Sequence, residues 1–182
     1  MSVVQQASSP QTIRELATAC TRYVKQALSL ELDYSPDTLP ILDYYLDDCR
    51  KLLSENKSGP KIEDILTLVI PAAGAYFGEV VRQAYPQTTW HAPGENYADY
   101  RLSFDQCSLA FNPFGFTLEA VHHSPQPGWG AHFQLHENDT EMVKQALETA
   151  GSVRPDDFFR LTIRFEVLQQ IAQRLMPTSP QA

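Results

Sequence analysis

The spacing of the hydrophobic residues along the chain changes twice, and these two changes constrain the fold more than any other sequence feature. Apolar residues recur at three- and four-residue steps from Thr12 to about Tyr85, which predicts helices. After Pro86 they alternate with polar residues, which predicts strands, and helical spacing returns from Asn138 to Leu175. Helices, then an alternating segment, then helices predict an α+β protein with an antiparallel sheet covered on one face by helices.

The N-terminal part predicts three helices with one irregularity. The first runs from Thr12 to Leu28, the second begins at Ser35 or Thr38, and the third covers residues 61–85. Pro71 in the third has no amide hydrogen for the carbonyl four residues earlier, which predicts a kink or a break. With a break, Pro71 is the first residue of a separate helix.

The alternating segment predicts a four- to five-stranded antiparallel meander with short connections. The residues from Asn112 to Gly115 ("NPFG") are interpreted as one of its turns. Two helices are expected to follow and to pack on one face of the sheet, the first capped by residue 138 or 139, the second by 156 or 157. The expected strands are 88–91, 97–104, 107–111, 116–123 and 131–136.

The length and composition predict a single compact domain. The chain has 182 residues, of which 43% are hydrophobic and 20% charged, values that are typical of globular proteins. We expect a disordered N-terminus at residues 1–11, one α+β domain at 12–176 and a disordered tail at 177–182. The net charge of −8 disfavours nucleic acids and anionic membranes and suits a basic partner.

The cysteines and the N-terminal residues predict a cytoplasmic protein. Cys20, Cys49 and Cys107 lie far apart, with no paired spacing for a disulfide framework or a metal motif. Reduced, mostly buried thiols are the expected state. The first eleven residues lack the basic and apolar regions of a signal peptide.

Residues Ile70–Val81 ("IPAAGAYFGEVV") form the most apolar stretch. The uncharged run between Asp64 and Glu79 has 14 residues, whereas a membrane span needs about 20, so we expect no membrane insertion. The alanines, with Gly74 and Gly78, predict a thin helix surface that another element approaches closely. Glu79 is costly to bury without a partner, and its expected role is structural, with Arg82 three residues on as its partner.

An acidic region is the strongest charge asymmetry in the chain. Six acidic residues between Glu31 and Asp48 precede the base Arg50. Interleaved tyrosines suit a surface that binds a basic protein, because tyrosine adds contact area at low entropic cost. A solvated helix face and a divalent cation site are the alternatives. The predicted partner-binding residues are Asp43, Tyr44, Asp47 and Asp48.

The five histidines, between residues 91 and 136, offer a second candidate site. No nucleophile elbow or phosphate loop is present, so no catalytic residue is predicted. The histidine spacings on strands are too wide to predict a metal site, although ligands can meet across strands. No metal or cofactor is therefore expected. The residues of this candidate pocket are Glu79, Glu119, His123 and His132.

Two segments resemble uncharacterised bacterial proteins of the domain-of-unknown-function type. The motif "GAYFGEVV", followed by a tryptophan at the head of the strands, is similar to a motif in those proteins, as is the upstream segment "LDYSPDTLPILDYYL". The resemblance covers about residues 28–135 and implies no activity, cofactor or catalytic residue. In size and charge the chain also resembles immunity proteins of bacterial toxin systems.

These observations favour a non-enzymatic, cytoplasmic protein-binding domain, adaptor or immunity-like, with an acidic partner face. The alternative is a small-molecule or metal-binding enzyme that uses the histidine-bearing sheet. The two hypotheses differ in where the functional residues lie, because one uses the second helix and the other uses the alternating segment.

Overall fold

The computed structural model describes residues 8–55, 60–150 and 153–176. These residues form helices and a three-stranded antiparallel sheet, which confirms the α+β class. The helices are α1 (Gln11–Leu28), α2 (Leu39–Glu55), α3 (Pro60–Asp64), α4 (Ile70–Ala84), α5 (Pro113–His122), α6 (Glu137–Ala150) and α7 (Leu161–Leu175), with helical turns at Pro36–Thr38, Ile65–Val69 and Tyr97–Asp99. The strands are β1 (Thr88–His91), β2 (Arg101–Phe104) and β3 (Ala110–Phe111), in the order β1-β2-β3.

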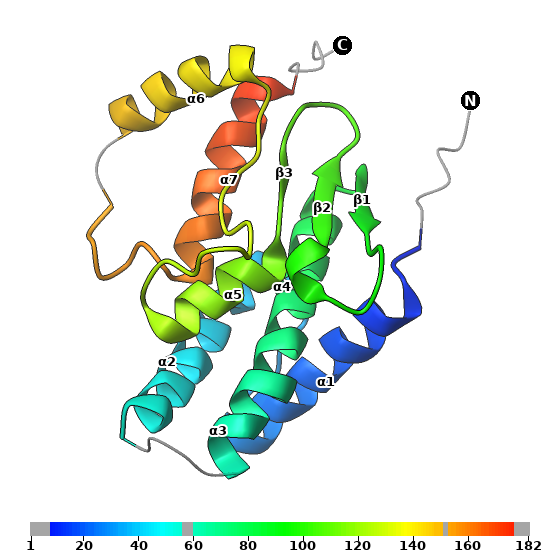
Figure 1. Cartoon of the computed structure of the whole chain (residues 1–182), viewed down its shortest axis with the longest axis vertical. Coiled ribbons are helices and arrows are strands. Elements are labelled where there is room, and N and C mark those ends of the chain that lie inside the picture. The colour runs from blue at the N-terminus through cyan, green and yellow to red at the C-terminus, as the bar shows by residue number, and fades with distance from the viewer. Residues whose placement is uncertain (1–7, 56–59, 151–152, 177–182) are drawn as a thin grey trace.

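Helix α4 lies at the centre of the molecule and the other elements surround it. It packs against α1 on one side and α5 on the other, while α7 packs against α2, α5 and α6. In Figure 1 the strands lie on the right of the view and α6 and α7 on the upper left, with α5 below them. The C-terminal helices therefore pack largely on other helices, rather than as a simple layer on the sheet.

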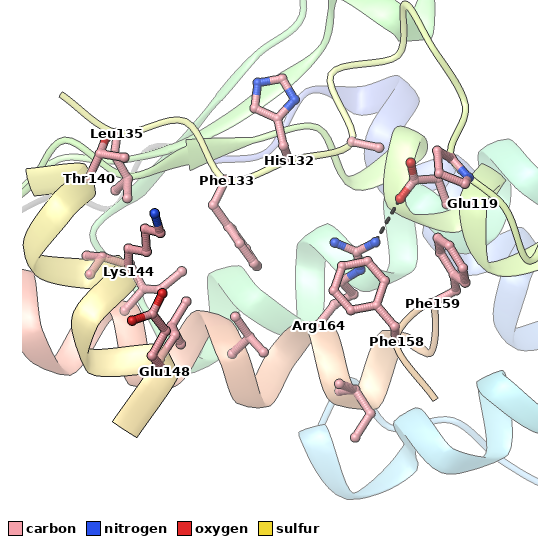
Figure 2. Close-up of a pocket in the computed structure, with 17 residues that line it drawn as sticks. Glu119, His132, Phe133, Leu135, Thr140, Lys144, Glu148, Phe158, Phe159 and Arg164 are labelled. Carbon is pink, nitrogen blue, oxygen red and sulfur yellow. Dashed lines mark hydrogen bonds and ion pairs between the residues drawn. The ribbon is translucent and has the colours of Figure 1, made fainter. Parts of the chain in front are cut away.

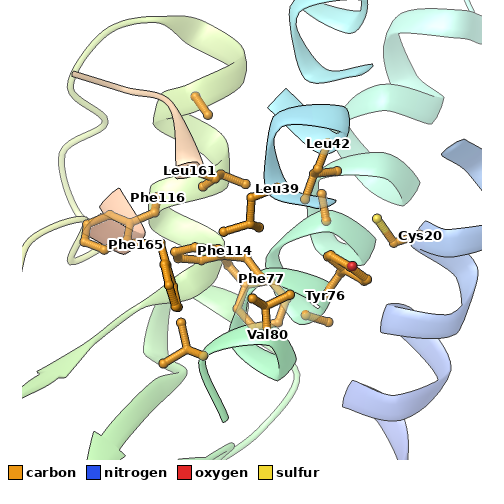
Figure 3. Packing of buried hydrophobic residues seen from close by; sticks show 14 of the residues in the cluster. Cys20, Leu39, Leu42, Tyr76, Phe77, Val80, Phe114, Phe116, Leu161 and Phe165 are labelled. Atoms are coloured by element: carbon orange, nitrogen blue, oxygen red, sulfur yellow. The ribbon is translucent and has the colours of Figure 1, made fainter. Parts of the chain in front are cut away.

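The core forms where α4 meets α5 and α2. Every residue of α4 from Ile70 to Val81 is buried, and Figure 3 shows Phe77 on the side of Phe114 and Tyr76 on the side of Cys20. The Phe114 backbone and ring lie directly over Gly74, and the Trp90 ring lies over Gly78. This contact confirms the prediction that the small residues of α4 make a surface for close approach.

Pro71 is accommodated by a change of helix geometry rather than by a loop. The segment Ile65–Val69 is a π-helical turn, in which the N–H of Ile70 donates to the carbonyl of Ile65. Pro71 then follows as the second residue of α4. A π turn inserts an extra residue into the helix, which fits the predicted irregularity at this proline.

One continuous helical segment, Ile62–Ala84, is long and apolar enough to cross a membrane by length and composition alone. The sequence-based length of 14 residues was too short, because the helix continues past both acidic ends of the apolar run. The protein itself buries 72% of the most apolar window of this segment. This is the position of a core helix and is consistent with a soluble protein.

The predicted strand 116–123 is wrong, since these residues belong to α5 and its C-terminal cap. The predicted turn at Asn112 is the start of this helix: the Asn112 side chain accepts hydrogen bonds from the N–H groups of Phe114 and Gly115, and Pro113 occupies the first turn. All residues from Pro113 to Val121 are buried. A helix buried on every side has no polar face, so its sequence carries no clear helical period.

The remaining strands are fewer and shorter than the expected meander. Thr88–His91 is confirmed with its predicted bounds, and it pairs in antiparallel register with Arg101–Phe104. The predicted strand 107–111 keeps only Ala110–Phe111, and 131–136 contributes a single bridge from Gln134 to Ala110. A four- to five-stranded meander is thus not found in the described part of the chain.

The first helix begins one residue before its predicted start at Thr12. Helix α1 starts at Gln11, and Ser9 before it is buried. Residues 1–7 of the expected disordered N-terminus and the tail 177–182 lie outside the described residues.

Candidate functional site

Glu79 does not share a site with the other three predicted pocket residues, Glu119, His123 and His132, and instead forms a buried hydrogen-bonded centre of its own. It is 7% exposed, and its carboxylate accepts hydrogen bonds from Ser9 Oγ at 2.6 Å and Trp90 Nε1 at 2.8 Å. Arg82 Nε lies 3.2 Å from both carboxylate oxygens. Glu79 thus joins the start of α1, α4 and β1, which agrees with the structural role and the Arg82 partner expected for it.

The predicted partner-binding residue Asp43 does not lie on an accessible face. It is 6% exposed, and its carboxylate accepts the N–H groups of Leu161 and Thr162 together with the Thr162 hydroxyl. Burial raises the pKa of Asp43, and these hydrogen bonds oppose the rise. The α7 N-terminus has no cap of its own, so Asp43 of α2 satisfies its free N–H groups. The predicted acidic face therefore loses Asp43.

The other predicted partner residues lie at the surface of α2. Tyr44 is 56% exposed, and Asp47 and Asp48 are partly exposed. Asp48 forms an ion pair with Lys51 at 2.8 Å, and the Asp47 carboxylate lies 3.4 Å from Arg50 Nε. The negative charge of this surface is therefore partly neutralised within α2 itself.

The structure contains a pocket of ≈ 510 Å³ bounded by α5, α6, α7 and the segment 125–135, which we call the α5–α7 pocket. Figure 2 shows Lys144 and Glu148 of α6 at one end and Glu119 with Arg164 at the other. A volume of this size and a mainly apolar lining are typical of small-molecule sites. The apolar wall includes Phe133, Leu135, Val143, Leu147, Val167 and Ile171.

A buried ion pair forms the inner end of the α5–α7 pocket. Arg164 Nη2 lies 2.7 Å from one Glu119 carboxylate oxygen, and both side chains are 7% exposed. The other Glu119 oxygen accepts the backbone N–H of Gln126 at 3.1 Å. The guanidinium carbon lies 4.6 Å from the Phe116 ring centroid and 4.2 Å from that of Phe158, so two aromatic faces enclose the cation.

Arg164 is not fully satisfied in this position. Its Nε is buried and has no hydrogen-bond partner among the residues that the structure describes. Burial lowers the pKa of Arg164, while the charge of Glu119 opposes this change. An arginine with a buried, unpaired donor is costly in a folded protein, so this end of the pocket is the most distinctive polar feature of the site.

Two of the four predicted pocket residues line the α5–α7 pocket, and a third lies beside it. Glu119 and His132 belong to its lining, and the His123 ring lies 5.5 Å from the ring of Phe159, which also lines it. Within the described ranges, no three His, Cys, Asp or Glu side chains gather closely enough to hold a metal ion. The structure therefore gives no geometric support for a cross-strand metal site made by Glu119, His123 and either His132 or His136.

Sequence reasoning missed Arg164, although the sequence contains a signal for it. Arg164 stands three residues after Leu161 and four before Leu168, on the apolar stripe of the last helix. A charged residue on a buried stripe requires a partner, and here that partner is Glu119, 45 residues earlier.

No family model, curated protein or solved structure matches this chain.

Proposed function

We propose that the protein binds a small, largely apolar molecule in the α5–α7 pocket. The observation that carries this proposal is the ≈ 510 Å³ volume, lined by the side chains of α6 and α7 and closed at one end by the Glu119–Arg164 pair. Few polar groups in an apolar cavity orient a ligand while its apolar body supplies most of the affinity. The predicted alternative of a small-molecule enzyme is thus proposed in part: the protein binds a small molecule, and no catalytic step is assigned to it.

The pocket is favoured over the acidic face because of what each offers a partner. Asp43 is buried as a helix cap, and the carboxylates of Asp47 and Asp48 lie beside basic side chains of the same helix. The α5–α7 pocket instead presents apolar side chains to an open volume. A ligand that fills it removes apolar surface from water, which stabilises the complex by about 25 cal/mol for each Å² buried.

Substitution of Val167 by tryptophan tests the pocket directly. Val167 is half-buried in α7 and lines the volume, so the larger side chain occupies space that a ligand needs. We expect the affinity for the neutral dye Nile red, measured by fluorescence titration, to fall at least about tenfold, the loss expected when about 1.4 kcal/mol of contact is removed.

The matched control is Leu66→Trp, which introduces the same side chain at a position that is 42% exposed and outside the pocket. Dye binding equal to that of the wild type is expected for this variant. If wild-type protein does not bind Nile red, or if both variants bind it as the wild type does, the α5–α7 pocket is not the ligand site.

A second candidate function is binding of a basic protein on the outer face of α2, in an adaptor-like or immunity-like role. The observation that favours it is Tyr44, an exposed aromatic side chain next to partly exposed acids in a protein of net charge −8. The remaining predicted surface consists of Tyr44, Asp47 and Asp48. Exposed tyrosines beside complementary charge are common in protein interfaces.

The double substitution Asp47→Lys with Asp48→Lys reverses the charge of this surface. We expect a basic protein captured by the wild type in a pull-down to be lost, because like charges across an interface repel. The control is Glu63→Lys with Asp64→Lys, which makes the same charge change at two exposed positions of α3. Capture that is unchanged by the α2 substitutions contradicts this function.

For the compartment, we propose the cytoplasm on the basis of the three free thiols. Cys20 and Cys49 are buried and Cys107 is half-buried in the turn before β3. Burial raises the pKa of Cys20 and raises that of Cys49 to about 11, so both remain protonated and unreactive at neutral pH. Free thiols in the core are typical of proteins kept in a reducing compartment.

A further inference from the structure

At the inner end of the α5–α7 pocket, the Glu119 carboxylate has hydrogen-bond partners for both oxygens, whereas Arg164 lacks a partner for one of its donors. Both Glu119 carboxylate oxygens already accept a hydrogen bond, one from Arg164 Nη2 and one from the Gln126 backbone. Arg164 instead keeps a buried Nε–H without an acceptor in the described structure. Among the described residues, the buried side-chain polar atom at this end of the pocket that has no partner is therefore a donor, so the complementary ligand group is an acceptor.

The Arg164 side chain is held in place before any ligand arrives. Phe116 is fully buried and lies against one side of the guanidinium, and the ion pair with Glu119 fixes one terminal nitrogen. Phe158, also stacked on the cation, is 45% exposed and belongs to the irregular segment before α7. Of these two rings stacked on the guanidinium, that of Phe158 is therefore the one that solvent reaches.

The apolar part of the pocket extends away from Arg164 toward α6. Figure 2 shows Phe133 between the arginine end and the Lys144 end, so an elongated molecule can lie along the wall of α6 and α7. Lys144, an exposed residue of α6, offers a second cation at the opposite end of the volume, where Glu148 also lines the pocket. A negatively charged head group can therefore bind either at the Arg164 end or at the Lys144 end of the pocket, and substitutions at the two positions distinguish the two cases.

From these observations we propose that the pocket takes a medium-chain amphipathic carboxylate, with its apolar chain along α6 and α7 and its carboxylate bound by Arg164. The proposal rests on the proposed function and adds the chemical class of the ligand. A carboxylate is favoured over a neutral acceptor because hydrogen bonds between two charged groups are shorter and stronger. Arginine is also the side chain whose planar donors best fit a carboxylate.

The test compares three molecules with the same chain length: sodium decanoate, 1-decanol and decylamine. Each displaces Nile red from the full-length wild-type protein, and the dissociation constants are compared. We expect decanoate to bind at least about tenfold more tightly than the alcohol or the amine, the ratio that one charge-assisted hydrogen bond provides. Equal affinities for decanoate and decanol overturn the carboxylate assignment but leave the proposed function intact, whereas no binding of Nile red or any of the three contradicts the function itself.

The variant Arg164→Lys locates the head group, because lysine keeps the charge and loses the planar set of donors. We expect it to lower the ratio of decanoate affinity to decanol affinity about tenfold, while the control Arg174→Lys, at an exposed position of the same helix, keeps the wild-type ratio. Loss of decanoate binding in Lys144→Met, with Arg164→Lys unaffected, places the carboxylate at the other end and overturns the proposal. If Arg164→Lys does not fold, the double variant Glu119→Gln with Arg164→Met answers the question: it should bind decanoate no more tightly than decanol.

Discussion

Replacement of Gly78 by leucine is expected to lower the free energy of unfolding by about 1–3 kcal/mol or more, a large share of the total stability of a typical domain. A Cβ atom at this position would overlap the Trp90 ring and would lie 3.3 Å from Pro113 Cγ. The ring cannot move aside easily, because Trp90 is buried and its Nε1 donates to Glu79 at 2.8 Å. Chemical denaturation followed by circular dichroism measures the change.

The milder substitution Gly78→Ala separates two effects of opposite sign. In a helix interior, alanine is more favourable than glycine by about 1 kcal/mol, so the substitution would stabilise α4 if space allowed. The overlap with Trp90 predicts destabilisation instead. Gly94→Ala is the matched control, because a Cβ there meets no atom within 4 Å. A Gly78→Ala protein that is as stable as the wild type would show that the close contact between α4 and β1 does not form.

Replacement of Arg164 by methionine is expected to cost about 3–5 kcal/mol of stability, because it leaves the Glu119 carboxylate buried without its counter-ion. Glu119 is 6% exposed and would keep only the Gln126 N–H as a partner. Thermal and chemical denaturation measure the loss. Arg174→Met, at an exposed position of α7, is expected to change stability by less than about 0.5 kcal/mol.

The double variant Glu119→Gln with Arg164→Met completes a thermodynamic cycle. Removal of both charges relieves the buried carboxylate, so we expect this protein to be more stable than Arg164→Met alone. Additive effects of the two substitutions would show that the two side chains do not interact. The cycle thus tests the ion pair at the end of the α5–α7 pocket by a measurement that needs no ligand.

Local sequence signals predicted several elements well. The α+β class, the first helix, the strand Thr88–His91 and the irregularity at Pro71 all follow from spacing and from proline geometry within a few residues. The close contact at Gly78 was also predicted, because small residues at helical spacing in an apolar helix leave room for a neighbour. Each of these features depends on residues close to one another in the chain.

Helix α5 shows where such signals fail. Its Phe116, Leu118 and Ala120 alternate as in a strand, but Thr117 and Glu119 between them are buried too. With both faces covered, alternation carries no information about the period of the backbone. The sequence did contain a helix start at Asn112 and Pro113, since an N-cap asparagine followed by proline is common at that position.

The sequence by itself determined the fold class, the apolar central helix with its thin surface and the pairing of Glu79 with Arg82 in the next turn. Only the tertiary structure decided that Asp43 caps α7 across 118 residues, that Glu119 meets Arg164 across 45, and that α5, α6 and α7 enclose the pocket. The physical reason is range. Helix spacing, caps and glycine notches act over one or two turns of chain, whereas the burial of a carboxylate and its choice of partner depend on which distant element packs over it.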